Sequence, residues 1–321
     1  MALASPHMGG VGTPHRTKLA TMRGEDGEES EEAQVRYCKG ELMYVKDFMQ
    51  TTLTTVTPNT RVSTAYGMMT MRGVRIRHLP VVTDEEALIG IITDRDIRLA
   101  AASDAPPMAE HELTSLLEKL RVRDIMTSEV VTVNGTTPVV EAGLIFLQKK
   151  FGCLPIVHDN RLEGIITVAD LLRAYIRQDN VEWLMEIGII MQKEVITATP
   201  AMSLAEVQRL MRDHHIRHIP VVLGKRLVGM ITDRDIREAS PSPATTLTRG
   251  EIAYQMETTP IKACMTQDVV WTCPGFTMLD AARVLLQRQI GCLPVVDHDT
   301  LVGIVTDMDC LRAFLETTRG A

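Results

Sequence analysis

The sequence lacks the features that several classes of protein require. No apolar run approaches the roughly 20 residues needed to span a bilayer, so we expect no membrane span. The net charge of -7 provides no basic field for nucleic-acid phosphates, so no nucleic-acid partner is expected. The nucleophile elbow, the P-loop, the zinc-protease motif and the glycine-rich dinucleotide motif are all missing. We therefore predict no catalytic residues and no metal site.

Cysteine use and the start of the chain bear on compartment and order. The six cysteines show no CxxC spacing, and no hydrophobic segment has the character of a secretory signal. We therefore expect a reduced, cytoplasmic compartment. Residues 1–40 combine glycine, proline and methionine with an acidic stretch, a mixture that offers little to a hydrophobic core. We expect them to form a disordered tail that is in part a cloning remnant.

Internal repeats organise the rest of the sequence. IRHLPVV at 76–82 recurs as IRHIPVV at 216–222, and GIITDRDIR at 90–98 recurs as GMITDRDIR at 229–237. A second set of matches links FGCLPIV at 151–157 with IGCLPVV at 290–296, and GIITVADLLRA at 164–174 with GIVTDMDCLRA at 303–313. The offset is 140 residues for the first match and 139 for the other three. A unit of about this length is therefore duplicated.

Each unit contains two similar halves, in which a Pro-Val-Val or Pro-Ile-Val strand precedes a turn and a Gly-x-x-Thr-x-x-Asp segment. Four repeats result, at residues 43–102, 121–178, 186–240 and 259–317. In the third, the β-branched run EVITATP precedes apolar residues at helical spacing, then two strands and a second helix. The predicted fold is α/β (α+β), with the order β-α-β-β-α in each repeat. Units this small should pair to bury their open faces.

This pattern resembles the CBS (cystathionine-β-synthase) domain family over residues 43–317. Two such domains in tandem resemble a Bateman module, and four in one chain resemble the gamma subunit of AMP-activated protein kinase. The resemblance implies that adenosyl ligands, usually AMP, ADP or ATP and sometimes S-adenosylmethionine, bind between paired repeats. It implies a regulatory sensor, not an enzyme, whose ligand changes the arrangement of the modules and their contacts with a partner.

The Gly-x-x-Thr-x-x-Asp segments supply the first candidate ligand residues. The threonine ends a strand and the aspartate lies in the first turn of the next helix, a place that suits a nucleotide. A carboxylate can accept hydrogen bonds from both ribose hydroxyls, and the resemblance assigns that role to Asp96, Asp170, Asp235 and Asp309. It places the threonines on ribose or phosphate: Thr93, Thr167, Thr232 and Thr306. The alternative is that these pairs only cap helices.

The first and third repeats (the odd repeats) differ from the second and fourth (the even repeats) just before the strand that contains the proline. The odd repeats carry Arg-His where the even repeats carry Gly-Cys, and they add an arginine inside TDRD. Because arginine forks suit phosphate oxygens, these residues predict phosphate-binding pockets around the odd repeats: Arg77, His78, Arg95, Arg217, His218 and Arg234. The alternatives are solvated surface charge for the arginines and packing for the histidines.

A further position lies just before the first strand of each repeat, where the family often has threonine after Ile-Met. The even repeats have Thr127 and Thr266 there, which we include among the nucleotide-binding candidates, and the odd repeats have Gln50 and Gln192. This departure puts the base and phosphate contacts of the odd sites in doubt.

The leading hypothesis is an adenine-nucleotide sensor that regulates a separate, unidentified protein. It would act as one closed four-repeat disc or as a homodimer, and it requires no cofactor, although Mg²⁺ with a triphosphate is left open. The alternatives are an interaction scaffold without a ligand and a sensor of S-adenosylmethionine or cyclic dinucleotides. An enzyme of the inosine-monophosphate-dehydrogenase type is disfavoured, because no region outside the repeats is long enough for a catalytic domain.

Overall fold

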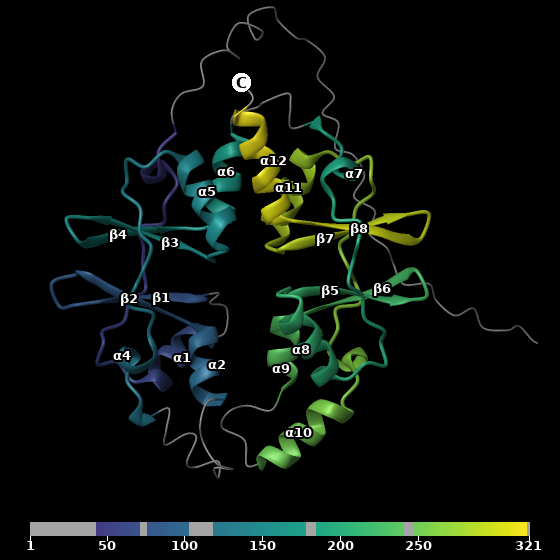
Figure 1. Cartoon of the computed structure of the whole chain (residues 1–321), viewed down its shortest axis with the longest axis horizontal. Coiled ribbons are helices and arrows are strands. Elements are labelled where there is room, and N and C mark those ends of the chain that lie inside the picture. Colours follow the sequence, from purple (N-terminus) through teal and green to yellow (C-terminus); the bar gives the residue numbers. More distant parts are fainter. Residues whose placement is uncertain (1–42, 71–75, 103–117, 178–183, 241–246, 320–321) are drawn as a thin grey trace, which may run out of the picture.

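The computed structural model describes residues 43–70, 76–102, 118–177, 184–240 and 247–319. The predicted tail at 1–40 lies outside these residues. The four repeats together form a flat molecule, with the first two repeats on one side and the last two on the other (Figure 1). We call these two halves the first and the second module.

Each repeat contains a helix, an antiparallel strand pair and a second helix. In the first module these elements are α1 (Val62–Thr70), β1 (His78–Val82), β2 (Leu88–Thr93) and α2 (Asp94–Ala102), then α5 (Val139–Lys149), β3 (Leu154–His158), β4 (Arg161–Ile166) and α6 (Val168–Ile176). In the second module they are α8 (Leu204–Asp213), β5 (His218–Leu223), β6 (Arg226–Thr232) and α9 (Asp233–Ala239), then α11 (Met278–Arg288), β7 (Cys292–Asp297), β8 (Thr300–Thr306) and α12 (Asp307–Arg319). Each repeat begins with a short helix: η2 (Val45–Asp47), α4 (Val122–Ile125), α7 (Ile187–Ile190) and η4 (Ile261–Ala263). Helix α10 (Arg249–Thr258) links the last two repeats.

The mixed helix and strand prediction is confirmed, although the first strand of each repeat is short. That strand is reduced to a single parallel bridge, such as Ala198 with Val221 in the third repeat. The following helix α8 forms as its spacing predicts, because Leu204, Val207 and Met211 are buried on one face. Ser203 caps this helix in a reciprocal arrangement with Glu206.

The chain crosses between the repeats of a module at the start of each repeat. Gln50, near the start of the first repeat, pairs with Ile165 in β4 of the second, with N–O distances of 2.9 and 3.0 Å. Thr127, near the start of the second repeat, pairs in return with Ile91 in β2 of the first, with N–O distances of 3.0 and 2.9 Å. The second module repeats this exchange with Gln192 on Ile304 and Thr266 on Met230.

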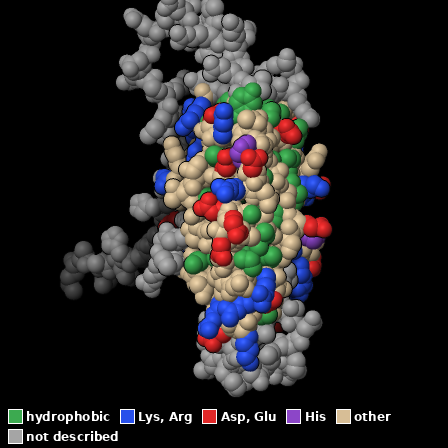
Figure 2. Space-filling view, turned by 90° about the vertical axis from the view of Figure 1, so that its left-hand side faces the viewer, with side chains coloured by type: hydrophobic (Ala, Val, Ile, Leu, Met, Phe, Trp, Pro, Cys, Tyr) green, Lys and Arg blue, Asp and Glu red, His purple; other side chains and the backbone are tan. Residues whose placement is uncertain are grey.

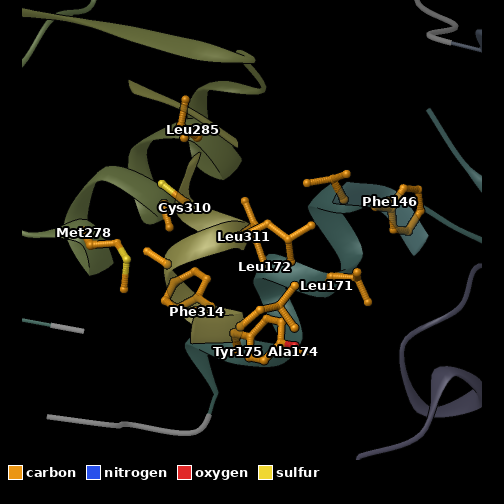
Figure 3. Packing of buried hydrophobic residues seen from close by; sticks show 14 of the residues in the cluster. Phe146, Leu171, Leu172, Ala174, Tyr175, Met278, Leu285, Cys310, Leu311 and Phe314 are labelled. Carbon is orange, nitrogen blue, oxygen red and sulfur yellow. The ribbon is translucent and has the colours of Figure 1, made fainter. Parts of the chain in front are cut away.

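The two modules meet mainly through their even repeats. Helices α5 and α6 pack against α11 and α12 in one continuous hydrophobic cluster, in which Leu172 and Leu311 lie close together (Figure 3). The rings of Tyr175 and Phe314 stack across this interface with centroids 5.4 Å apart. The cores of the odd repeats are separate from it and from each other. The even repeats therefore hold the modules together.

The outer surface of the first module has no uniform charge. Figure 2 shows acidic and basic side chains interleaved on this face, around scattered hydrophobic ones. Within the residues that the structure describes, no helix combines the length and apolar character needed to cross a membrane.

Candidate functional site

In all four Thr–Asp pairs the aspartate accepts two hydrogen bonds from its threonine. In the first repeat, Oδ2 of Asp96 accepts hydrogen bonds from the amide of Thr93 at 2.8 Å and from its hydroxyl at 2.6 Å. The amide of Asp96 donates in return to the Thr93 hydroxyl at 3.3 Å. The same oxygen is used by the other three aspartates. Each aspartate therefore uses Oδ2 to bind its threonine, and its other carboxylate oxygen, Oδ1, lies outside this Thr–Asp arrangement.

In the even repeats that remaining oxygen already has partners. Oδ1 of Asp170 accepts from Arg173 at 2.6 Å and from the side-chain amide of Gln50 at 3.2 Å. Oδ1 of Asp309 accepts from Gln192 at 3.2 Å and lies 3.6 Å from Arg312. Both aspartates are almost fully buried, at 3% and 4% exposure. These carboxylates are therefore satisfied by the protein itself.

The corresponding oxygen of the odd repeats has different surroundings. Among the described residues, none donates a hydrogen bond to Oδ1 of Asp96 or Asp235, and both aspartates are only partly buried. Leu99 and Glu238 occupy the positions that Arg173 and Arg312 hold in the even repeats. The odd repeats thus offer a carboxylate oxygen to a ligand where the even repeats do not.

The structure corrects the expected placement of the crossing residues. Thr127 and Thr266 follow the even repeats' short helices, but their backbones pair with β2 and β6 beside the odd motifs. Gln50 and Gln192 likewise lie beside the even motifs. The expectation that the glutamines alter the odd sites is therefore wrong, because the chain crosses between repeats before each motif. We define the odd sites as Thr93, Asp96 and Thr127, and Thr232, Asp235 and Thr266.

Arginines from the odd repeats of both modules approach one another at the centre of the molecule. Desolvation lowers the pKa of Arg77, and the positive charges of Arg217 and Arg237 in the other module lower it further. Arg77 and Arg217 are nevertheless exposed, so both can be reached by an anion. Such mutually repelling guanidinium groups would be stabilised by phosphate. The sequence predicted two separate phosphate pockets, whereas in the structure Arg77 and Arg217 approach each other.

The histidines next to these arginines are packing residues in this structure. His78 lies against Gly152 of the second repeat, and His218 lies against Gly291 of the fourth. Burial lowers the pKa of each histidine to about 4, so both are neutral at pH 7. They therefore add no positive charge to the centre in this state.

The arginines of the TDRD segments lie exposed in the first turns of α2 and α9. Arg234 pairs with Glu238 at 2.6 Å along the exposed side of α9, and Arg95 is exposed on α2. Arg237, one turn further along α9, instead reaches across the module boundary to Asp94. It also lies 3.4 Å from Asp233. Arg237 therefore links the N-terminal ends of α2 and α9, which belong to the two odd repeats.

The architecture agrees with a comparison against protein families. The sequence model of the CBS domain matches residues 45–103, 122–177, 186–242 and 261–316. The chain belongs to the CBS domain family. The CBS repeats account for each of the capped Thr–Asp motifs described above.

Similar proteins include others with CBS repeats. Protein MJ1225 of Methanocaldococcus jannaschii is 32% identical over 271 residues, which cover 82% of this chain and 95% of that protein. Its crystal structure, described as that of a candidate archaeal homologue of g-AMPK, matches 85% of this chain and 100% of its own with a TM-score of 0.69 at 30% identity. Protein MJ1404 of the same organism is 30% identical over 86% of this chain and 63% of its own length.

One enzyme also matches in part. Inosine-5'-monophosphate dehydrogenase of Korarchaeum cryptofilum is 28% identical over 64% of this chain but only 38% of its own length. That similarity therefore extends over a minor part of the enzyme, and it carries no assignment of catalysis to the CBS repeats described here.

The contacts of several residues around the Thr–Asp motifs were not predicted from the sequence. Arg173 and Arg312 stand three positions after the motif aspartate, at a spacing that permits a pair on one helix face, so the sequence held a usable signal. Gln50 and Arg237 act across repeats and carried no such signal. Among the described residues, no group of three or more His, Cys, Asp or Glu side chains is placed to hold a metal ion.

Proposed function

We propose that this protein is a regulatory sensor that binds adenine nucleotides at its two odd sites. The observation that carries the proposal is the contrast between carboxylate oxygens. Oδ1 of Asp96 and Asp235 has no donor among the described residues, whereas Oδ1 of Asp170 is held by Arg173 and Gln50. A ribose offers two hydroxyl donors to such an oxygen. Thr127 and Thr266 would lie beside the same nucleotides.

The phosphates would extend from these sites toward the centre of the molecule. Arg77 and Arg217 supply the positive charge there, and both arginines are exposed. We propose no further cofactor, and Mg²⁺ would enter only together with a triphosphate. Because the arginines come from different modules, a phosphate between them would favour a closer arrangement of the odd repeats. A ligand can shift that arrangement only by its difference in affinity for the two states.

The output of the sensor would be a change in its contacts with a separate regulated protein. The even repeats are fixed by their shared core, so a change in arrangement would be largest at the odd repeats. The partner surface would therefore include residues near α2, α9 or α10, which lie at that end of the molecule (Figure 1).

Isothermal titration with AMP, ADP, ATP, S-adenosylmethionine and cyclic dinucleotides tests this function. The sharpest variant is the double substitution Asp96→Asn and Asp235→Asn, because the asparagine carbonyl keeps the helix cap while the amide removes the free acceptor. We expect adenine-nucleotide affinity to fall about tenfold or more, in line with loss of a hydrogen bond to a charged group.

Asp280→Asn is the matched control. Asp280 caps α11 through Thr277 at 2.7 Å with the same Thr-x-x-Asp spacing, but outside the repeated motif. Its substitution should leave affinity unchanged. Unchanged affinity in the double variant would overturn the assignment to the odd sites. No binding of any ligand by ligand-free protein would favour an interaction scaffold, and preferred binding of S-adenosylmethionine or a cyclic dinucleotide would replace the proposed ligand.

A further inference from the structure

A methionine follows the short helix of each repeat, and its side chain lies against the motif glycine of the other repeat in the module. The four glycines, which begin the Gly-x-x-Thr-x-x-Asp segments, are buried. A Cβ atom added at each would lie far inside van der Waals distance of the methionine sulfur, Sδ: Gly90 with Met126 at 2.7 Å, Gly164 with Met49 at 2.7 Å, Gly229 with Met265 at 2.8 Å and Gly303 with Met191 at 2.5 Å. Each methionine therefore occupies the space that a side chain at the glycine would need.

The residue after each methionine is held by the same packing. Met126 ends its short helix, because its amide donates to the carbonyl of Val122 at 2.8 Å. The next residue, Thr127, pairs with Ile91 in β2. A Cβ atom at Gly90 would lie only 3.1 Å from the carbonyl oxygen of Thr127. The contact between methionine and glycine therefore fixes how closely the next residue approaches the motif.

The even repeats show where the side chain of that next residue is directed. Gln50 follows Met49, and its side-chain amide lies 3.2 Å from both carboxylate oxygens of Asp170. The fourth repeat contains the same contact at 3.2 Å, from Gln192 to Oδ1 of Asp309. In these repeats the methionine thus places the side chain that follows it beside the motif aspartate.

The odd repeats combine the same methionine contact with a shorter residue. Thr127 takes the backbone pairing that Gln50 has in the even repeat, but its hydroxyl group is too short to reach across as the glutamine amide does. The side chain of Thr127 is exposed, and none of the described residues donates to Oδ1 of Asp96. The threonine therefore leaves the motif aspartate open to a ligand.

We propose that Met126 and Met265 are positioning residues of the two odd sites. Packed against their glycines, they hold Thr127 and Thr266 at the depth at which a nucleotide fits between each threonine and its motif aspartate. The inference rests on the proposed function. The methionines act through the threonines, so their own contact with the nucleotide is not required.

The two motif glycines of the first module supply a matched pair of substitutions. Gly90→Ala and Gly164→Ala each place a methyl group 2.7 Å from a methionine sulfur, but only Gly90→Ala displaces a residue of an odd site. The Asp235→Asn background leaves the site of the first repeat for titration with AMP and ATP. There we expect Gly90→Ala to weaken affinity about fivefold or more, in line with the loss of one hydrogen bond. Gly164→Ala should leave affinity within about twofold, although urea denaturation should show similar losses of stability for both variants.

The second module repeats the comparison independently. The Asp96→Asn background leaves the site of the third repeat, where Gly229→Ala should weaken AMP and ATP binding by a similar factor. Gly303→Ala, which meets Met191 of an even site, should not. A loss from Gly303→Ala as large as that from Gly229→Ala would contradict the inference.

Met126→Ala is the second variant for the first module, because it removes the contact without adding a group if Gly90→Ala fails to fold. It should also weaken binding about fivefold, and Met49→Ala is its control in the same background. Equal losses from Gly90→Ala and Gly164→Ala, or no loss from either Gly90→Ala or Met126→Ala, would overturn the inference while leaving the nucleotide function in place. If the unaltered protein binds no nucleotide, the function itself falls and the inference falls with it.

Discussion

At the residue scale, two glycines lie so close to histidines of the neighbouring repeat that no larger side chain fits in their place. A Cβ atom at Gly152 would lie 2.4 Å from Nε2 of His78, and one at Gly291 would lie 2.9 Å from Cε1 of His218. The histidine rings are half-buried and neutral at pH 7, and each occupies the space beside its glycine. The Arg-His pair of each odd repeat and the Gly-Cys pair of the even repeat in the same module are therefore matched, because the histidine packs against the glycine.

Gly152→Ala should lower the free energy of unfolding by about 1–3 kcal/mol, because the added methyl group overpacks the contact with His78. Urea denaturation measures the change. Combining Gly152→Ala with His78→Ala should cost less than the sum of the two single substitutions. The control is Gly67→Ala in α1, where a Cβ meets nothing within 4 Å, so this variant should be neutral or more stable. Equal effects of Gly152→Ala and Gly67→Ala would contradict the steric argument.

At the element scale, the crossing segments decide which type of site each motif becomes. The motif in β2 and α2 receives Thr127 from the second repeat, while the motif in β4 and α6 receives Gln50 from the first. The glutamine amide reaches both oxygens of Asp170 at 3.2 Å, which a threonine in its place is too short to do. The even sites are thus closed by a side chain that belongs to the other repeat of the module.

Thr127→Gln should convert the site of the first repeat toward the even type. The new amide would compete with a ribose for Asp96, so nucleotide affinity at this site should fall about tenfold or more in the Asp235→Asn background. Gln50→Thr is the reciprocal control and should leave that affinity within about twofold, because Gln50 faces Asp170. Titration calorimetry measures both. A larger loss with Gln50→Thr than with Thr127→Gln would refute the crossed assignment.

At the scale of the whole molecule, the modules are joined unequally at their two ends. The even repeats share a hydrophobic core in which α6 packs against α11 and α12 (Figure 3). Between the odd repeats, Arg237 and Asp94 form a partly exposed ion pair, with 29% and 20% of their side-chain surfaces accessible. The core resists separation far more than the ion pair, because burial of apolar surface outweighs a part-solvated charge pair.

Phe314→Ala should therefore lower the free energy of unfolding by about 3–5 kcal/mol, and Arg237→Ala by about 1 kcal/mol or less. Urea denaturation of the full chain measures both effects. The Phe314 substitution should also loosen the contact with Tyr175, so limited proteolysis between the modules should increase. Arg209→Ala, which removes an exposed ion pair with Glu257, serves as the control for Arg237→Ala. A loss from Arg237→Ala as large as that from Phe314→Ala would show that the odd repeats also hold the modules together.

Much of the fold could be predicted because its causes are local. Repeated segments such as GIITDRDIR and GMITDRDIR revealed the duplication, and helical spacing in SLAEVQRLMRDHH predicted α8. Helix capping was the alternative interpretation of the Thr-x-x-Asp spacing, and the structure contains this Thr–Asp hydrogen bond in every repeat. The partners of Asp170 were harder to predict, because Gln50 lies 120 residues away along the chain.

The sequence by itself thus determined the repeats, their paired arrangement and the motif residues, since each depends on neighbours within one segment. Only the tertiary structure decided that Thr127 belongs beside Asp96 and Gln50 beside Asp170, because chain crossing leaves no local pattern. It also decided that Arg77 and Arg217, which belong to different modules, approach each other at the centre of the molecule. Charges far apart in sequence interact only after the hydrophobic core of the even repeats fixes the two modules against each other.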